Sequence, residues 1–247
     1  MGLFSEKARQ LPTTSYGYTP PAEATASGWQ CNNVDCGTGD SPAPKRWPAR
    51  CPLCGGSVDP EFNRPWKEEA RGYRLQMLMD REGDKYGVLE ASIREWKYGQ
   101  ALAQSDFDRA EALRTETHTW LGKMSEQIPH FAEEAETRSM IVRHALAYGQ
   151  TDAAADELSD WLAGVDVFHL DTTHLGDNTD EGRQLRRTCF SLLPSALDFL
   201  ATPSARSHRS APLIDQAARH LGSITQHELP PDMVRKWQTL MAAPQRS

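Results

Sequence analysis

Four of the chain's five cysteines lie close together near the N-terminus. Cys31 and Cys36 are separated by four residues, Cys51 and Cys54 by two, and fourteen residues separate the two pairs. Pairs of cysteines joined by a short loop are typical of a tetrahedral zinc site, with iron or disulfides as the alternatives. Because four thiolates fill the coordination shell, we expect a structural zinc ion without an open catalytic position.

The second cysteine pair lies in the segment CPLCGG, residues 51–56. Pro52 stiffens the turn between the two cysteines, and Gly55 and Gly56 let the backbone turn so that its N–H groups point at the sulfurs. Residues 29–56 therefore resemble the knuckles of zinc ribbons and rubredoxins, and Trp29 resembles the aromatic residue that often packs over such a site. The first pair departs from that pattern, because C-x4-C is longer than the usual C-x2-C. The resemblance implies a small metal-stabilised ribbon but names no function.

A basic and aromatic segment, KRWPAR, lies between the two cysteine pairs. Such residues can stack a base and neutralise phosphate, which makes four of them candidate contacts for nucleic acid or a partner protein: Lys45, Arg46, Trp47 and Arg50. In the alternative, which the acidic residues nearby favour, Trp47 covers the metal site and the basic side chains lie in solvent.

A second basic group lies near the start of an expected helix, at i, i+3 and i+4: Arg183, Arg186 and Arg187. Side chains at this spacing share one helix face, and a helix start favours anions. The group is a further candidate contact for phosphate or an acidic partner. The alternative is a solvated face that pairs with the acidic middle of the chain.

Signs of catalysis are few in this sequence. The segment FHLDTTHLGD holds His169, Asp171, His174 and Asp177, whose types could bind a metal in a loop. A solvated interhelical loop is the favoured interpretation. The common phosphate-loop, dinucleotide-binding, zinc-protease and serine-hydrolase motifs do not occur. We therefore expect a protein that is not an enzyme, with the 169–174 loop as the place where a metal-dependent activity would reside.

The apolar spacing from Pro65 onward predicts a helical body. We expect helices at 65–83, 85–104, 129–148, 180–201, 211–223 and 231–243, with one beginning at Ser105, capped by a Ser105-x-x-Asp108 box, and one from Thr151 to Leu162. Pro194 should kink or split the helix at 180–201. The fold class is mainly α, a helical-hairpin body with a small N-terminal four-cysteine zinc ribbon. The expected organisation is a flexible arm at 1–28, the ribbon at 29–58 and an all-α body at 59–247.

Two stretches of the body can be aligned at an offset of 44 residues, 101–113 with 145–158. Around them, residues 98–122 and 145–162 resemble the inter-helix turns of tetratricopeptide units, although the spacing is longer than in that family. Plain antiparallel hairpins without repeat ancestry remain the alternative. Either arrangement would present a helical groove to a peptide or partner protein.

The charge is distributed unevenly over the 247 residues. The net charge is −7, and residues 59–180 hold 13 basic and 25 acidic residues, a net of −12. This makes the body as a whole a poor nucleic-acid binder. Since no apolar run is long enough for a membrane span and no secretory leader is evident, we expect a cytoplasmic protein without a membrane partner. The sequence thus favours a zinc-ribbon adaptor that binds another protein, with a nucleic-acid-associated regulator acting through the ribbon loop as the alternative.

Overall fold

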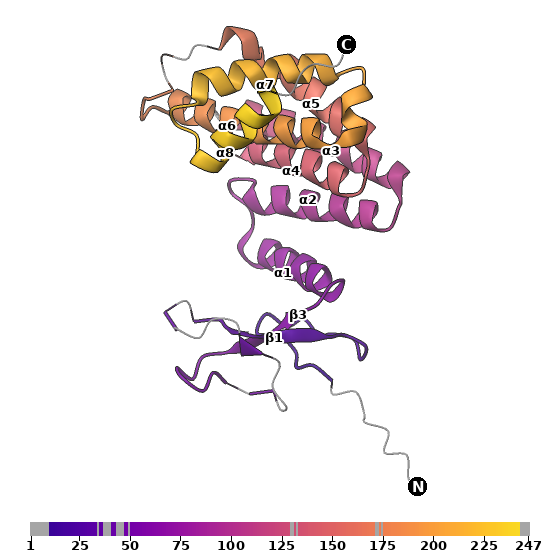
Figure 1. Ribbon diagram of the computed structural model, residues 1–247. Coiled ribbons are helices and arrows are strands. Elements are labelled where there is room, and N and C mark those ends of the chain that lie inside the picture. Colours follow the sequence, from indigo (N-terminus) through magenta and orange to yellow (C-terminus); the bar gives the residue numbers. More distant parts are fainter. Residues whose placement is uncertain are drawn as a thin grey trace. The chain divides into compact units, whose positions relative to one another are not determined.

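The computed structural model divides the chain into two compact units, residues 1–84 and 85–247 (Figure 1). The structure describes residues 10–33, 35–36, 41–42, 47–48, 50–128, 131, 133–170, 173 and 175–242. The first unit includes the strand Val58–Phe62 and the helix Trp66–Glu82, which lie within the range 59–247 that we expected for the body.

The first unit is built on a three-stranded antiparallel sheet with strand order β2-β1-β3. The strands are β1 (Ala26–Cys31), β2 (Ser41–Pro42) and β3 (Val58–Phe62). Trp29 pairs with Pro60, and Cys31 pairs with Val58. Strand β1, which ends at the first cysteine, therefore lies beside β3, which follows the second cysteine pair. Helix α1 (Trp66–Glu82) follows the sheet.

Residues 10–28 pack onto the sheet and α1, and do not form the free arm that we expected. Leu11 and Tyr18 are buried in a cluster with Phe62, and the rings of Tyr18 and Phe62 meet edge to face at 5.6 Å. The buried carboxylate of Asp59 adds polar anchors, because it accepts hydrogen bonds from the Ser15 N–H at 2.6 Å and the Ser15 hydroxyl at 2.9 Å. Composition alone therefore misjudged these residues, since Leu11, Tyr16 and Tyr18 pack in one apolar cluster.

The second unit consists of helices, which confirms the mainly α fold class. They are α2 (Val88–Ala103), α3 (Phe107–Gln127), α4 (Glu133–Ala147), α5 (Thr151–Val165), α6 (Asp180–Ala201), α7 (Ala211–Thr225) and α8 (Pro231–Ala242). Helix α2 packs against α3 and α4, α4 against α5 and α6, and α6 against α7 and α8. No helix of the described residues is long and apolar enough to cross a membrane.

The turns that follow α2 and α4 have the same backbone hydrogen bonds. The N–H of Asp106 donates to the Ala101 carbonyl at 2.9 Å, and the N–H of Gln150 donates to the Ala145 carbonyl at 2.8 Å. These are the long hydrogen bonds of a helix C-terminal Schellman turn. The offset of 44 residues that relates the two sequence stretches therefore also relates two turns of like geometry.

The turn geometry corrects both expected helix caps. Ser105 lies in the left-handed region with φ 58°, as Gly149 does with φ 71°, so each ends the preceding helix. The residue after Ser105 caps α3 instead, because the side chain of Asp106 accepts the N–H of Arg109. Thr151 is the first residue of α5 and not its cap.

The main core lies among α4, α5, α6 and α7. Leu192, Leu193 and Leu197 of α6 are fully buried in it. Pro194 does not split α6, which runs as one helix through the proline. Burial of the same apolar face before and after Pro194 compensates for the backbone hydrogen bond that proline removes.

Candidate metal centre

The CPLCGG segment folds as a tight turn around the sulfurs of Cys51 and Cys54. The N–H of Gly55 donates to the Cys51 carbonyl at 2.9 Å, and the N–H of Cys51 donates to the Gly56 carbonyl at 2.8 Å. Gly55 has φ 72°, a conformation that favours glycine. This turn brings the N–H of Gly56 to 3.4 Å from the Cys54 sulfur, so the expected N–H···S geometry is present.

The first cysteine pair forms a looser turn at the end of β1. The N–H of Asn33 donates to the Cys31 sulfur at 3.4 Å, and the N–H of Cys36 donates to the Asn33 carbonyl at 3.0 Å. The longer C-x4-C spacing thus keeps one N–H···S bond and still returns the second cysteine to the site.

The four sulfurs come together in one cluster. All four Sγ atoms lie within 4.8 Å of one another, with Cys31 to Cys54 at 3.5 Å and Cys36 to Cys51 at 3.7 Å. Zinc–sulfur bonds of about 2.3 Å in a tetrahedron place the sulfurs about 3.8 Å apart. The five cysteines are free thiols. The cluster can therefore hold a metal ion with all four positions of a tetrahedral shell taken by protein.

Two tryptophans cover the buried side of the cluster. Trp29 is buried with Cys51 and Val58, and Trp47 packs against the same group. Trp47 therefore covers the site, as the alternative interpretation of the KRWPAR segment has it. The opposite side is open, since Cys54 is exposed while Cys51 is only 3% exposed.

Crowding of the four thiols affects the pKa of Cys31. The Asn33 N–H acts to lower this pKa, but desolvation and the three neighbouring thiols together raise it to about 12. A bound dication would reverse the balance, because it deprotonates its thiol ligands.

Of the three basic residues of the ribbon loop, the structure describes Arg50. Arg50 donates from its guanidinium to the Gly55 carbonyl at 3.1 Å, which braces the second cysteine turn. Lys45 and Arg46 lie outside the described residues.

The second basic group also makes contacts within the protein. Arg183 donates to the Asn178 carbonyl at 2.6 Å, and Arg186 donates to the carbonyls of Leu175 at 2.5 Å and Asp177 at 2.7 Å. These two side chains hold the loop that precedes α6. Arg187 is exposed.

The His169 loop has no described metal cluster. His169 is largely exposed, and its Nδ1 lies 2.9 Å from a carboxylate oxygen of Asp166, whose hydrogen bond and charge raise the pKa of the histidine. Asp171 and His174 lie outside the described residues. Among the residues that the structure describes, the four-cysteine cluster is the group of ligand atoms close enough to hold a metal.

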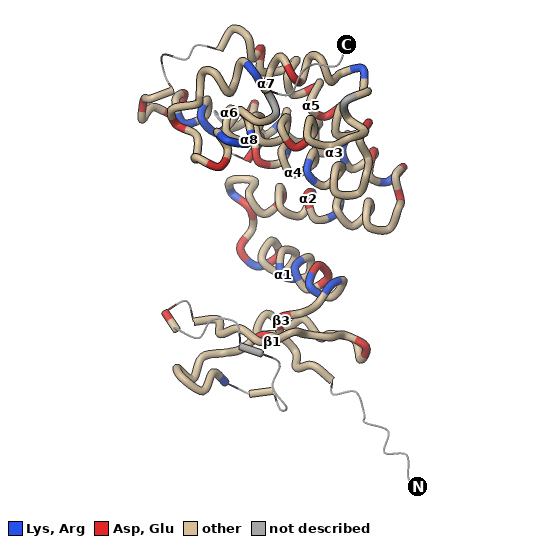
Figure 2. Tube along the Cα trace, in the orientation of Figure 1, with Lys and Arg blue, Asp and Glu red and all other residues tan. Residues whose placement is uncertain are grey.

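Sequence reasoning missed a buried charge network in the second unit. Glu157 of α5 is fully buried, and its carboxylate oxygens lie 2.5 Å from Nε2 of His118, 3.1 Å from Arg138 and 3.5 Å from Arg114. The network joins α3, α4 and α5. The one signal in the sequence is the i, i+4 spacing of Arg114 and His118, which is too common to be specific. Figure 2 shows that Lys, Arg, Asp and Glu otherwise lie intermixed along the helices.

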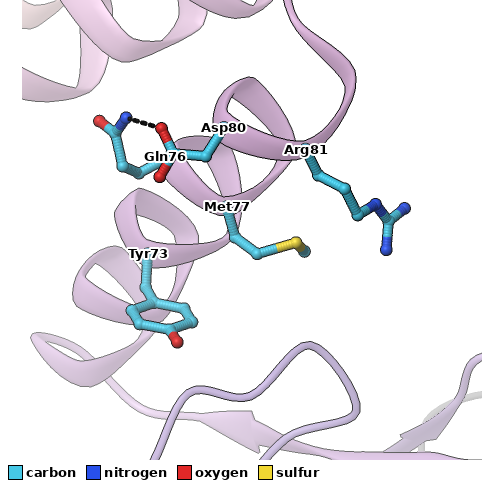
Figure 3. A pocket seen from close by; sticks show the side chains of 5 residues that line it. All are labelled: Tyr73, Gln76, Met77, Asp80 and Arg81. Atoms are coloured by element: carbon cyan, nitrogen blue, oxygen red, sulfur yellow. Dashed lines mark hydrogen bonds between the residues drawn. The ribbon is translucent and has the colours of Figure 1, made fainter.

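A shallow hollow of about 380 Å³ lies along one face of α1 (Figure 3). Its described lining residues are Tyr73, Gln76, Met77, Asp80 and Arg81. The amide of Gln76 donates to Asp80 at 3.0 Å, and Tyr73 is 46% exposed. The lining pairs no nucleophile with a base, so the hollow suits contact with another molecule better than chemistry.

No protein-family model, curated protein or solved structure matches this chain. The interpretation of the metal centre therefore rests on the geometry of its own residues.

Proposed function

We propose that the chain is a non-enzymatic adaptor of the cytoplasm whose N-terminal unit is held folded by one structural zinc ion. The observation that carries this proposal is the group of four thiols whose sulfurs all lie within 4.8 Å of one another, with two contacts of 3.5 Å and 3.7 Å that match the edge of a zinc–thiolate tetrahedron. Zinc is favoured over harder cations because every ligand is a thiolate. A reducing compartment would keep these thiols available for the metal.

The small apolar cluster beside the sulfurs explains why this end of the first unit would need a metal. The sulfur-covering cluster holds three buried residues, Trp29, Cys51 and Val58. Zinc coordination supplies about 10 kcal/mol or more to such modules. The ion would thus fasten the end of β1 to the turn before β3.

The adaptor role is supported by exposed apolar side chains on helices. Tyr73 and Met77 of α1 line an open hollow, and Phe107 and Tyr148, at the two like turns of the second unit, are 46% and 41% exposed. We propose that a partner protein contacts these helical surfaces and that the ribbon around the zinc ion is a second docking surface. The nucleic-acid alternative has less support, because Arg50, like the loop-holding arginines of α6, donates to carbonyls of the protein itself.

Elemental mass spectrometry of the purified chain tests the metal. We expect one zinc per chain in the wild type, and none in the Cys51→Ser/Cys54→Ser variant. Cys189→Ser is the matched control, because this cysteine is buried in the helical core away from the cluster. Two metals in the wild type, with one surviving the double substitution, would contradict the proposal and direct attention to the His169 loop.

Site-specific photo-crosslinking in cells tests the adaptor role. A photoreactive residue in place of Tyr73 should crosslink to a specific protein, whereas one at the exposed, polar Glu126 should not. Crosslinks to nucleic acid, or equal yields at both positions, would contradict protein binding through α1.

A further inference from the structure

The four sulfurs of the metal centre differ in their access to solvent. Cys54 is exposed, Cys31 and Cys36 are half-buried, and Cys51 is 3% exposed beneath Trp29. The two close sulfur contacts differ in the same way. The contact between Cys31 and Cys54 is exposed, and the contact between Cys36 and Cys51 is partly buried.

The exposed contact is also the shorter of the two. The sulfurs of Cys31 and Cys54 are 3.5 Å apart, so about 1.5 Å of approach would bring them to bonding distance. Gly56 lies beside both: a β-carbon there would be 3.2 Å from the Cys54 sulfur and 3.5 Å from the Cys31 sulfur. Because Gly56 has no side chain, the space next to these sulfurs stays clear.

We propose that Cys54 is an oxidative modification site for hydroperoxides, with Cys31 as its resolving cysteine. This inference rests on the proposed zinc binding, which keeps the sulfurs as nucleophilic thiolates. The Cys54 sulfur attacks one oxygen of the hydroperoxide, so that a sulfur–oxygen bond forms, the oxygen–oxygen bond breaks and the remaining oxygen leaves, once protonated, as an alcohol or as water. The product at Cys54 is a sulfenic acid.

The Cys31 sulfur then attacks the Cys54 sulfur. A sulfur–sulfur bond forms, the sulfur–oxygen bond breaks, and the oxygen leaves as water after protonation. In total, the two thiolates lose two electrons, the hydroperoxide gains them, and two protons are consumed. The zinc ion loses two of its four ligands and dissociates, because Cys36 and Cys51 alone do not close a tetrahedral shell.

Loss of zinc would couple oxidation to the fold of the first unit. Cys31 is the last residue of β1 and pairs with Val58, the first residue of β3, so the metal and the sheet share this position. Thiol reductants reverse disulfides and sulfenic acids. The unit would therefore lose its zinc-bound form under oxidant and regain it with reductant and zinc.

Hydrogen peroxide added to the zinc-loaded full-length chain tests this inference. Zinc release is followed with a chromogenic chelator, and disulfides are mapped by alkylation and peptide mass spectrometry. We expect one zinc released per chain, with Cys31–Cys54 as the major disulfide and recovery after reductant and zinc are added. A major Cys36–Cys51 disulfide, or oxidation of Cys54 without zinc release, would overturn the inference.

Two matched variants separate the exposed contact from the buried one. Cys54→His and Cys36→His each replace one sulfur by a nitrogen ligand that zinc also accepts. We expect peroxide to release zinc about tenfold more slowly from Cys54→His than from Cys36→His. Equal rates in the two variants would refute the role of Cys54. If a variant fails to hold zinc, the disulfide map of the wild type still decides.

The two proposals fail in different ways. A wild-type chain purified without zinc contradicts the proposed function. A chain that carries one zinc but forms a different disulfide contradicts this inference alone.

Discussion

Replacement of Glu157 by glutamine should destabilise the helical unit strongly. The carboxylate is fully buried between Arg138 at 3.1 Å and His118 at 2.5 Å, with Arg114 at 3.5 Å. In the Gln variant one oxygen becomes an amide that can only donate, so it faces groups that are themselves donors. Breaking a buried ion pair from one side costs about 3–5 kcal/mol, because the remaining charge is left without compensation.

The neighbouring carboxylates reduce this cost. Arg114 keeps Glu111 at 2.8 Å and Asp160 at 3.3 Å, and Arg138 keeps Glu134 at 3.3 Å. The loss should therefore lie at the lower end of the range, at about 3 kcal/mol. Urea unfolding of the zinc-loaded full-length chain, followed by far-ultraviolet circular dichroism, measures it, since seven of the eight described helices lie in the second unit.

Asp160→Asn is the matched control for Glu157→Gln. Both carboxylates contact Arg114, but the side chain of Asp160 is 56% exposed. Exposed ion pairs contribute up to about 1 kcal/mol, so the control should change the unfolding free energy by no more than that. Equal losses in the two variants, or a loss below about 1 kcal/mol for Glu157→Gln, would refute the argument that this buried charge joins three helices.

Three further predictions concern the second unit. Gly222→Ala should destabilise α8 by about 1–3 kcal/mol, because a β-carbon there would lie 2.2 Å from an indole ring of α8; hydrogen exchange that stays unchanged in α8 would contradict this. Ser105 and Gly149 both have positive φ, so Ser105→Gly should stabilise the protein by about 1 kcal/mol and Gly149→Ala should destabilise it by about as much. Melting temperatures that do not rise in the first variant and fall in the second would contradict this. The hydrogen bond from Arg114 lowers the pKa of Glu111 below its ordinary value of 4.5. The ionised carboxylate therefore stabilises the fold fully above pH 4.5, and this stability is lost as the pH falls through the lowered pKa of the folded state. Glu111→Gln should weaken this acid dependence in a circular-dichroism titration, and an unchanged dependence would count against it.

The fold class and the clustering of the four cysteines could be predicted from the sequence because both depend on local patterns. Four cysteines in two short-spaced pairs have few arrangements other than a shared cluster, and glycine at position 55 suits the left-handed turn that the structure shows. The helices likewise follow from apolar residues that recur at three and four, a period that the backbone itself imposes. The ends of the helices are harder to predict. Serine is a common N-cap residue, so Ser105 resembled the cap of the next helix, whereas its left-handed backbone ends the preceding one.

Only the tertiary structure decided which polar and aromatic side chains are used internally. Arg50 and Arg186 were candidate contacts for a ligand with a solvated face as the alternative, and the fold brings a carbonyl of the chain to each of them. Tyr18 looked like part of a free arm, yet it packs on Phe62 from a distant strand. Glu157 had no specific signal in the sequence, because its partners come from two other helices. Local spacing determines secondary structure and ligand pairs, whereas burial depends on contacts between residues far apart in the chain, which no local pattern records.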